Sequence, residues 1–267
     1  GSLLPGVDRP AVVWTLRVAA DGRVGDLAGG GVAVGRALVH VVAKLDYAGV
    51  SADAARGTLH PSISALPAFG QLRRRVALEQ GRITLDLPAQ EVTRTDGRWT
   101  IGLAVRYDSE EWNAELSLLT GMVAGKIMRD ADVGLLRTVP APPDAAIKTL
   151  RGLAHTLGVE WGDGLTVGQF LARQPADSPR TLALMSATTS LLSGSDYLAL
   201  PAPILDGAEP VTEHSGLASV YAHVTAPLRR LPDRFATEVC VAVAAGDPVP
   251  QWVLDALPEL PKGIRES

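Results

Sequence analysis

The order of the hydrophobic patterns constrains this chain more than any other feature of its sequence. Two stretches rich in β-forming residues, "AVVWTLRVAADGRV" (11–24) and "EVTRTDGRWTIGLAV" (91–105), contain Asp-Gly pairs that predict hairpin turns, at Asp21-Gly22 and Asp96-Gly97. From Ser109 onward, apolar residues recur at helical spacing instead. Hairpins followed by helices predict an α+β fold.

The remaining expected elements follow from periodicity and from capping residues. In chain order they are a strand over 32–47, a helix over 62–80, a strand over 82–88, a helix capped by Ser109, a short strand within 133–143, helices over 144–158, 166–173 and 178–193, and a last long helix ending at "GDPVP" (246–250). One face of the helix that begins at Ser109 is expected to carry Trp112, Leu116, Leu119, Val123 and Ile127. The run "RRR" at 73–75 predicts a solvated helix face, with a phosphate-guiding patch as the alternative.

Composition excludes several function classes. With 25 Lys and Arg against 29 Asp and Glu, the net charge is −4, so the chain does not hold nucleic acid by bulk charge. The single cysteine, Cys240, excludes an internal disulfide and fits a reducing, cytoplasmic location without a disulfide-linked partner. No apolar run has the length of a membrane span. The five histidines show no metal-ligand spacing.

The stretch "YAHVTAPLRRLPDR" (221–234) allows two interpretations. Pro227 fits the first position of a helix, with Leu228 and Leu231 on its apolar face. In the simpler interpretation Arg229 and Asp233, four residues apart, form a surface pair and nothing more. In the functional interpretation Arg229 and Arg230 lie in the first helical turn and grip a phosphate. Local sequence alone favours the simpler interpretation.

Four stretches in order resemble one family, the ribonuclease II or RNB family of exoribonucleases. They are "SLLPGVDRPAVVWTLRVAADGRV", "AKLDYAGV", "LSLLTGMVAGKIM" with the following "VGLLRTVPAPPDAAIKTLRGLAHTLG", and "YAHVTAPLRRLPDR". The last resembles the family signature His-Phe-Thr-Ser-Pro-Ile-Arg-Arg-Tyr-x-Asp. Among family members the chain looks most like the actinobacterial type.

The resemblance implies an RNB-like catalytic domain that hydrolyses single-stranded RNA from 3′ to 5′ and releases nucleoside 5′-monophosphates, with carboxylate-held Mg²⁺ as cofactor. It also implies roles for individual residues. Arg229 would contact the phosphates near the scissile bond as the catalytic arginine, and Tyr47, at a strand end, would clamp the 3′-terminal nucleotide. The other substrate-binding residues that it implies are Glu115, His223, Thr225 and Arg230.

The chain also departs from the family pattern. Ala226 and Leu231 replace the serine and tyrosine of the signature, and Thr237-Glu238 replaces the expected His-Arg; Thr225 is a possible substitute cap. The family's aspartate cluster is absent from residues 1–267, and Asp46, Asp130, Asp132 and Asp233 are too scattered to replace it.

We therefore expect residues 1–267 to be the C-terminal part of an RNB catalytic domain, without flanking cold-shock or S1 modules and weakly active or inactive alone. The alternatives are a non-catalytic RNB-like module that binds RNA or a protein, and a structural α+β domain with no ligand.

Overall fold

The computed structural model describes residues 3–266 apart from 96, 105, 177 and 204–208. The helices and 3₁₀ turns are α1 (Tyr47–Arg56), η1 (Pro61–Ile63), α2 (Leu66–Glu79), α3 (Asp108–Asp130), α4 (Asp144–Thr156), α5 (Val167–Ala172), α6 (Pro179–Thr188), η2 (Thr189–Leu192), η3 (Ser215–Leu217), α7 (Leu231–Ala245), α8 (Gln251–Ala256) and α9 (Leu260–Glu266). The strands are β1 (Asp8–Leu16), β2 (Val32–His40), β3 (Gln90–Thr95), β4 (Arg98–Leu103), β5 (Gly134–Thr138), β6 (Asp196–Leu200), β7 (Glu213–His214) and β8 (Ser219–Val220). The predicted α+β class is confirmed.

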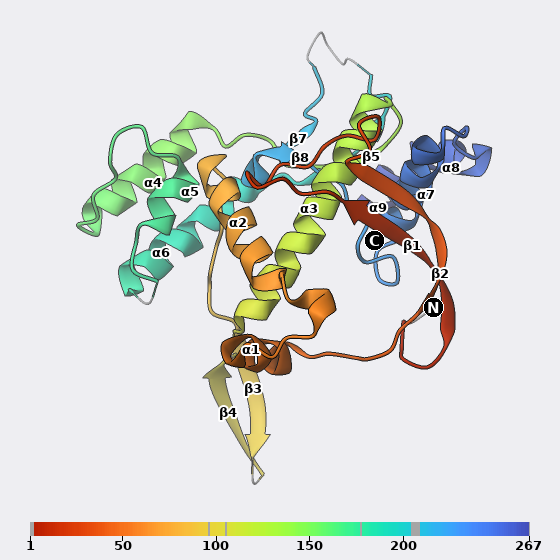
Figure 1. Ribbon diagram of the computed structural model, residues 1–267. Coiled ribbons are helices and arrows are strands. Elements are labelled where there is room, and N and C mark those ends of the chain that lie inside the picture. The colour runs from red at the N-terminus through yellow and green to blue at the C-terminus, as the bar shows by residue number, and fades with distance from the viewer. Residues whose placement is uncertain (1–2, 96, 105, 177, 204–208, 267) are drawn as a thin grey trace.

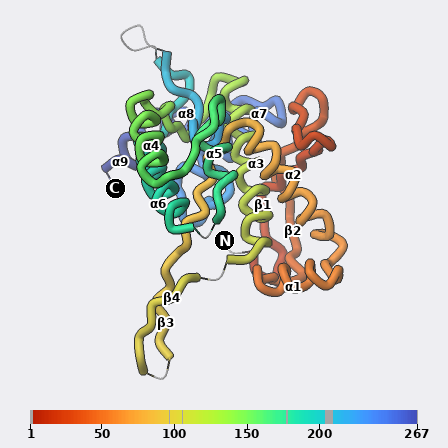
Figure 2. Tube along the Cα trace, turned by 90° about the vertical axis from the view of Figure 1, so that its left-hand side faces the viewer, coloured from red at the N-terminus to blue at the C-terminus, as the bar shows by residue number. Residues whose placement is uncertain are grey.

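The described strands form four antiparallel pairs: β1–β2, β3–β4, β5–β6 and β7–β8. The β1–β2 ribbon and α7 lie on one side of α3, which crosses the middle of the molecule, and α4, α5 and α6 lie on the other side (Figure 1). The β3–β4 hairpin projects away from the body in both views (Figure 2). The long helix α3 is therefore the element against which the others are arranged.

Two hydrophobic clusters hold these parts together. One joins α3, β5 and α7 through fully buried side chains such as Met128, Leu136 and Val239. The other belongs to α4, α5 and α6, where the rings of Phe170 and Trp161 stack at 4.1 Å. Cys240 lies in the first cluster, and burial raises the pKa of its thiol to about 12. Within the described ranges, no helix combines the length and the hydropathy that a membrane span requires.

Several predicted elements differ from the observed ones in the first half. Strand β2 ends at His40, and Tyr47 begins α1 because the Asp46 side chain accepts a hydrogen bond from the Gly49 N–H at 2.8 Å and caps the helix. The main partner of β1 is β2, so the turn at Asp21-Gly22 closes only a short bridge between Val18 and Val24. The predicted 91–105 hairpin is present as β3 and β4, with Asp96 and Val105 outside the described residues.

The segment 82–88 is not a strand. Its Ile83 N–H donates to the Gly216 carbonyl at 2.9 Å, but no ladder forms. The alternation was informative all the same, because Ile83, Leu85 and Leu87 pack against the α4–α6 cluster. The alternation of apolar and polar residues thus marks a segment that packs one set of side chains inward, although the segment pairs with no strand among the described residues.

Helix α3 begins earlier than predicted. Helix α3 starts at Asp108 after Tyr107, so Ser109 is not its cap; the buried Ser109 hydroxyl instead donates to the Tyr47 carbonyl at 2.8 Å. On the predicted face, Leu116 is 43% exposed while the other four side chains are buried. The remaining predicted helices are present: 62–80 as η1 and α2, 144–158 as α4, 166–173 as α5, and 178–193 as α6 with η2.

The predicted solvated face of the "RRR" run is wrong for its first member. Arg73 is 4% exposed, because its guanidinium lies between α2 and α3 and donates to the Gly22 carbonyl at 2.6 Å. Burial, the largest influence, lowers the pKa of Arg73. Arg74 forms ion pairs with Glu111 and Asp86, and only Arg75 remains both exposed and unpaired among the described residues of the run.

Candidate functional site

The stretch 221–234 lies directly on the backbone of α3. Two glycines four residues apart, Gly121 and Gly125, leave room for the approach, and the Ala222 N–H donates to the Gly121 carbonyl at 3.0 Å. A Cβ atom on Gly121 would lie 2.2 Å from the Tyr221 ring, and one on Gly125 would lie 2.8 Å from the Tyr221 nitrogen. Helix α3 therefore fixes where this stretch begins.

Strands β5 and β6 hold the same stretch from the other side. The Arg137 N–H donates to the Tyr221 carbonyl at 2.8 Å, and the Tyr197 hydroxyl and His223 Nδ1 share a hydrogen bond of 2.8 Å. Burial, together with the positive charges of Arg230 and Arg137, lowers the pKa of His223 to about 4. His223 is therefore neutral near pH 7 and serves as a hydrogen-bonding and packing group.

Asp233 clamps the turn that follows. Its carboxylate is fully buried, and it accepts hydrogen bonds from the Ala226 N–H at 2.7 Å and from Arg230 Nε and Nη2 at 2.9 Å each. The partner of Asp233 is thus Arg230, and the predicted pairing of Arg229 with Asp233 is wrong. The reason is that residues 226–229 form a turn, so the helical spacing of four does not apply to Arg229.

The same turn corrects the predicted helix start. Helix α7 begins at Leu231, with Pro232 in its first turn and Arg230 as the residue before it. Pro227 therefore precedes the helix, and Leu228, at 69% exposed, and Leu231, at 55% exposed, do not lie on its buried face. The N–H groups of Arg229 and Arg230 are not free for an anion, because both donate to the Ala226 carbonyl.

Arg229 is left as the available cation of the loop. Its side chain is exposed and makes no hydrogen bond or ion pair with any residue that the structure describes. Thr225 is also exposed, and the turn is held by Asp233 without a hydrogen bond from the Thr225 hydroxyl. A free guanidinium on a loop that buried groups hold in place can meet an anionic oxygen with two parallel hydrogen bonds.

Tyr47, the first residue of α1, lies at the start of α3 (Figure 1), whereas the stretch 221–234 meets α3 farther along, at Gly121 and Gly125. Tyr47 is 44% exposed, and its hydroxyl accepts a hydrogen bond from Asn113 Nδ2 at 3.1 Å. Together with apolar side chains including Phe69 and Leu116, it lines a cavity of about 550 Å³. An aromatic ring in a mostly apolar hollow is suited to a flat, partly apolar ligand.

Glu115 is buried in an ion pair. It is 3% exposed and takes two hydrogen bonds from Arg82, one of them 3.0 Å from Nη1 to Oε2. Glu115 follows Asn113 by two positions, about 200° around the helix, so it lies on a different side of α3 from the one that meets Tyr47. Of the six predicted site residues, the structure brings His223, Thr225, Arg229 and Arg230 together, and it places Tyr47 and Glu115 elsewhere.

The side chains present do not fit a carboxylate-held metal ion. Among the residues that the structure describes, no three His, Cys, Asp or Glu side chains come together as a metal site would require. Three of the four candidate aspartates are engaged: Asp46 caps α1, Asp130 bonds Lys126 and Arg129, and Asp233 clamps Arg230. We therefore derive no chemical step through a metal from these residues.

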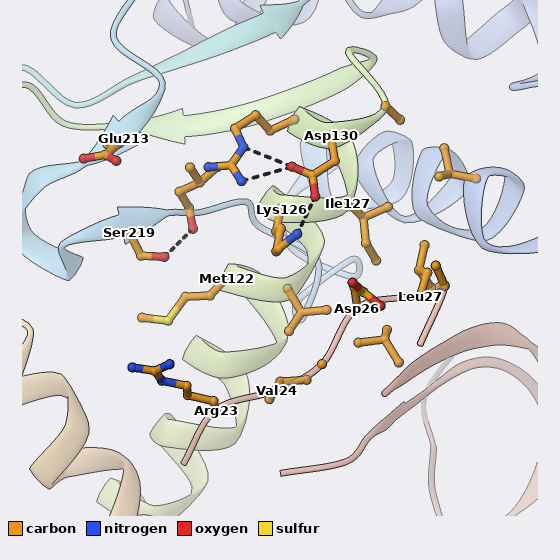
Figure 3. Close-up of a pocket in the computed structure, with 18 of the residues that line it drawn as sticks. Arg23, Val24, Asp26, Leu27, Met122, Lys126, Ile127, Asp130, Glu213 and Ser219 are labelled. Atoms are coloured by element: carbon orange, nitrogen blue, oxygen red, sulfur yellow. Dashed lines mark hydrogen bonds and ion pairs between the residues drawn. The ribbon is translucent and has the colours of Figure 1, made fainter. Parts of the chain in front are cut away.

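A separate cavity of about 780 Å³ opens between the 23–28 segment and α3. Figure 3 shows Lys126 and Asp130 together on its α3 wall, with Val24 and Leu27 on the wall across from them. None of the six predicted site residues lines it. Its lining is mixed: Lys126 and Arg129 pair with Asp130, while Arg23, Asp26, Arg73 and Glu213 line it without pairing with one another among the described residues, and it is not part of the loop site.

Sequence reasoning missed two features that position the loop. The glycine pair of α3 was visible as "GMVAG" (121–125), a small-residue spacing that permits close backbone approach. The Arg230–Asp233 pair was visible as a spacing of three, which also brings side chains together near a helix start.

Comparison with known proteins gives a consistent picture. The family model of the RNB domain matches residues 1–243. The apo form of Mycoplasma genitalium RNase R is similar in structure, with 17% sequence identity and a TM-score of 0.79 over 98% of this chain and 41% of that chain. The structure of Mycoplasma genitalium RNase R in complex with ribose methylated single-stranded RNA has 16% sequence identity and a TM-score of 0.78, over 98% of this chain and 41% of that chain. Yeast Ssd1, a pseudonuclease, has 17% sequence identity and a TM-score of 0.70, over 96% of this chain and 32% of that chain.

No curated protein matches the chain. The chain spans less than half the length of each structure named above. At these identities the structural likeness shows the fold, and the match of the family model over residues 1–243 shows the family.

Proposed function

This chain belongs to the RNB domain family, and from that premise we propose that it is the RNA-gripping part of a 3′-to-5′ exoribonuclease domain. The substrate would be single-stranded RNA, and the complete domain would release nucleoside 5′-monophosphates by hydrolysis. The observation that carries the proposal is the free Arg229 guanidinium on a loop whose neighbour, Arg230, is tied to a buried carboxylate.

In this proposal each loop residue has a distinct task. Arg229 binds a backbone phosphate through its planar fork of N–H donors. Arg230 keeps that guanidinium in place through Asp233, so little conformational freedom is lost when RNA binds. His223 remains uncharged and holds the start of the loop against Tyr197, and the exposed Thr225 offers a hydroxyl to the RNA backbone.

Tyr47 and Glu115 would act at the first half of α3. The half-exposed Tyr47 ring is available to stack on the 3′-terminal base, with its hydroxyl fixed by Asn113. Glu115 is buried against Arg82, so we assign it the positioning of α3 and not direct contact with RNA.

RNB nucleases generally depend on a divalent metal ion, and Mg²⁺ would activate water for hydrolysis. The described residues do not supply a carboxylate set for such an ion. We therefore expect the chain by itself to bind single-stranded RNA and to hydrolyse it weakly or not at all.

A non-catalytic RNA-binding module is the second candidate. The engagement of Asp46, Asp130 and Asp233 in structural contacts favours it, as does the likeness in fold to a pseudonuclease. The two candidates share the RNA-binding loop and differ only in whether RNA is shortened.

The test measures binding and decay separately. Affinity for a 5′-labelled single-stranded RNA is followed by fluorescence anisotropy in EDTA, and decay is followed on gels with Mg²⁺. We expect Arg229→Ala to weaken binding roughly tenfold, and the matched variant Arg75→Ala, which removes another exposed and unpaired arginine, to leave it unchanged.

Equal affinity of Arg229→Ala and the unchanged chain would refute the phosphate-gripping role. Efficient Mg²⁺-dependent shortening of the RNA by the purified chain would refute both the expectation of weak or absent hydrolysis and the non-catalytic candidate.

A further inference from the structure

An exposed apolar surface lies beside the loop site. Leu231 and Phe235 are one helical turn apart on α7. The rings of Phe235 and Trp252 pack in an edge-on arrangement, with their centroids 5.6 Å apart. Leu231 is 55% exposed and Trp252 is 56% exposed. We name these three side chains the aromatic platform. Helix α8, which carries Trp252, lies next to α7 (Figure 1).

The aromatic platform is anchored to the main hydrophobic cluster. Val253, the neighbour of Trp252, is 0% exposed and belongs to the main hydrophobic cluster. Phe235 is partly buried against the same cluster. The Trp252 ring therefore projects from a fixed backbone and is braced at its edge by Phe235, so it needs little ordering to receive a ligand.

The charges around the platform favour a polyanion. Arg234, on the same turn of α7 as Phe235, is exposed and donates from Nε to the Pro227 carbonyl at 3.0 Å, which places it over the loop that carries Arg229. Two of the neighbouring carboxylates are paired with arginines, Asp233 with Arg230 and Glu238 with Arg36. Asp255 accepts a hydrogen bond from the neutral Gln251 and keeps its negative charge, so the positive charge of the surface lies on the Arg229 and Arg234 side.

We infer that the aromatic platform stacks bases of single-stranded RNA whose phosphates are held by Arg229 and Arg234. The inference rests on the proposed function, because it extends the path of the same RNA beyond the loop. Stacking on an aromatic ring suits any base sequence, and flanking arginines suit the backbone. A stable protein interface buries about 800 Å² on each partner, more than three side chains supply, so RNA is the occupant that the surface favours.

The experiment compares five proteins by anisotropy in EDTA over a range of NaCl concentrations: the unchanged chain, Trp252→Ala, Trp252→Phe, Trp99→Ala and Arg229→Ala. Trp99, at 68% exposed, lies on the projecting β4 strand and serves as the matched control. Each protein is tested with a single-stranded RNA and with an RNA of equal length that carries abasic positions.

We expect Trp252→Ala to weaken binding of the intact RNA roughly tenfold, Trp252→Phe to retain most of the affinity, and Trp99→Ala to change nothing. The slope of log Kd against log salt should stay the same for Trp252→Ala, because stacking releases no counterions, whereas Arg229→Ala should lower it by about 0.7. With abasic RNA the difference between Trp252→Ala and the unchanged chain should disappear.

Three results would overturn the inference. One is an unaltered affinity of Trp252→Ala while Arg229→Ala binds weakly, which leaves the proposed function intact. Another is an equal loss with intact and abasic RNA, which indicates damage to the fold. The third is loss of self-association in Trp252→Ala at unchanged RNA affinity, which indicates a protein contact. Absence of RNA binding by the unchanged chain would instead refute the proposed function and this inference with it.

Discussion

Two arginine–carboxylate pairs with buried carboxylates perform different tasks in this molecule. The Arg82–Glu115 pair joins residues 33 positions apart, and both side chains are almost fully buried, at 6% and 4% exposed. The Arg230–Asp233 pair joins residues three positions apart, with the arginine 22% and the aspartate 0% exposed. The first pair ties α3 to the segment after α2, and the second fixes one loop at the start of α7.

The difference shows where a buried charge pair can serve binding. The long-range pair is buried between two distant parts of the chain, so its removal should affect the whole fold. The local pair immobilises a turn, and the adjacent Arg229 is exposed and unpaired among the residues that the structure describes. Its removal should loosen a binding loop more than the core. The variants described next test whether the two pairs differ in this way.

The largest effect is expected from Glu115→Ala. This variant leaves Arg82 buried without a partner and also removes the negative charge that raises the pKa of Arg73. The free energy of unfolding should fall by about 3–5 kcal/mol, measured by urea denaturation. The double variant Arg82→Met with Glu115→Leu, which removes both charges together, should recover much of the loss. If the free energy of unfolding of Glu115→Ala falls by less than about 1 kcal/mol, the pair does not stabilise the core.

Asp233→Asn should cost about 2–4 kcal/mol, since it weakens a fully buried group that takes three hydrogen bonds. The decisive measurement is amide hydrogen exchange, which should speed up mainly in residues 223–234. RNA affinity should fall as well, because Arg229 loses its fixed position. Exchange that rises equally throughout α3 and α7 would mean that the two pairs are equivalent, and the comparison would fail.

Acid should weaken the loop region through His223. Its pKa is lowered to about 4 in the folded chain, mainly by burial, while the unfolded chain titrates near 6.5. Between these values the unfolded state binds more protons, so stability is complete above about pH 6.5 and is lost as the pH falls toward 4, by about 3 kcal/mol at most. His223→Phe should flatten this part of the pH profile of unfolding.

The exposed His155 offers a control, because His155→Asn should leave the slope as it is. If His223→Phe keeps the full slope between pH 6.5 and 4, the acid sensitivity lies elsewhere, for instance at His214, whose pKa burial also lowers. Arg230→Met should raise the pKa of His223, since the Arg230 charge is among the causes that lower it.

The sequence predicted the fold where local signals act alone. The β3–β4 hairpin follows from the Asp-Gly pair of the sequence at 96–97, and α4 follows from Asp144 and the left-handed Gly158, with φ of 66°. At Arg73 the prediction failed because a distant partner decided the outcome: the loop at Gly22 reaches over α2 and covers this side chain. At Tyr47 a local signal was missed, because Asp46 caps a helix directly after an apparent strand.

The candidate site was predictable to the extent that it is contiguous. His223, Thr225, Arg229 and Arg230 lie together because they share one loop. The choice between the two adjacent arginines was not predictable, since it depends on a turn at 226–229 that the carboxylate of Asp233 stabilises from the following helix. Tyr47 and Glu115 are separated because helical geometry places Asn113 and Glu115 on different sides of α3.

The smallest effect on stability, and the sharpest test of the loop, comes from the adjacent arginines. Arg229→Ala should change the free energy of unfolding by no more than about 0.5 kcal/mol, because its side chain is exposed and unpaired among the described residues. Arg230→Ala should cost more, about 1–3 kcal/mol, because it leaves the buried Asp233 carboxylate with only the Ala226 N–H as a donor. Urea denaturation of both variants beside the unchanged chain measures the difference. Equal costs would mean that both arginines are structural, and Arg229 would no longer be available to bind a phosphate.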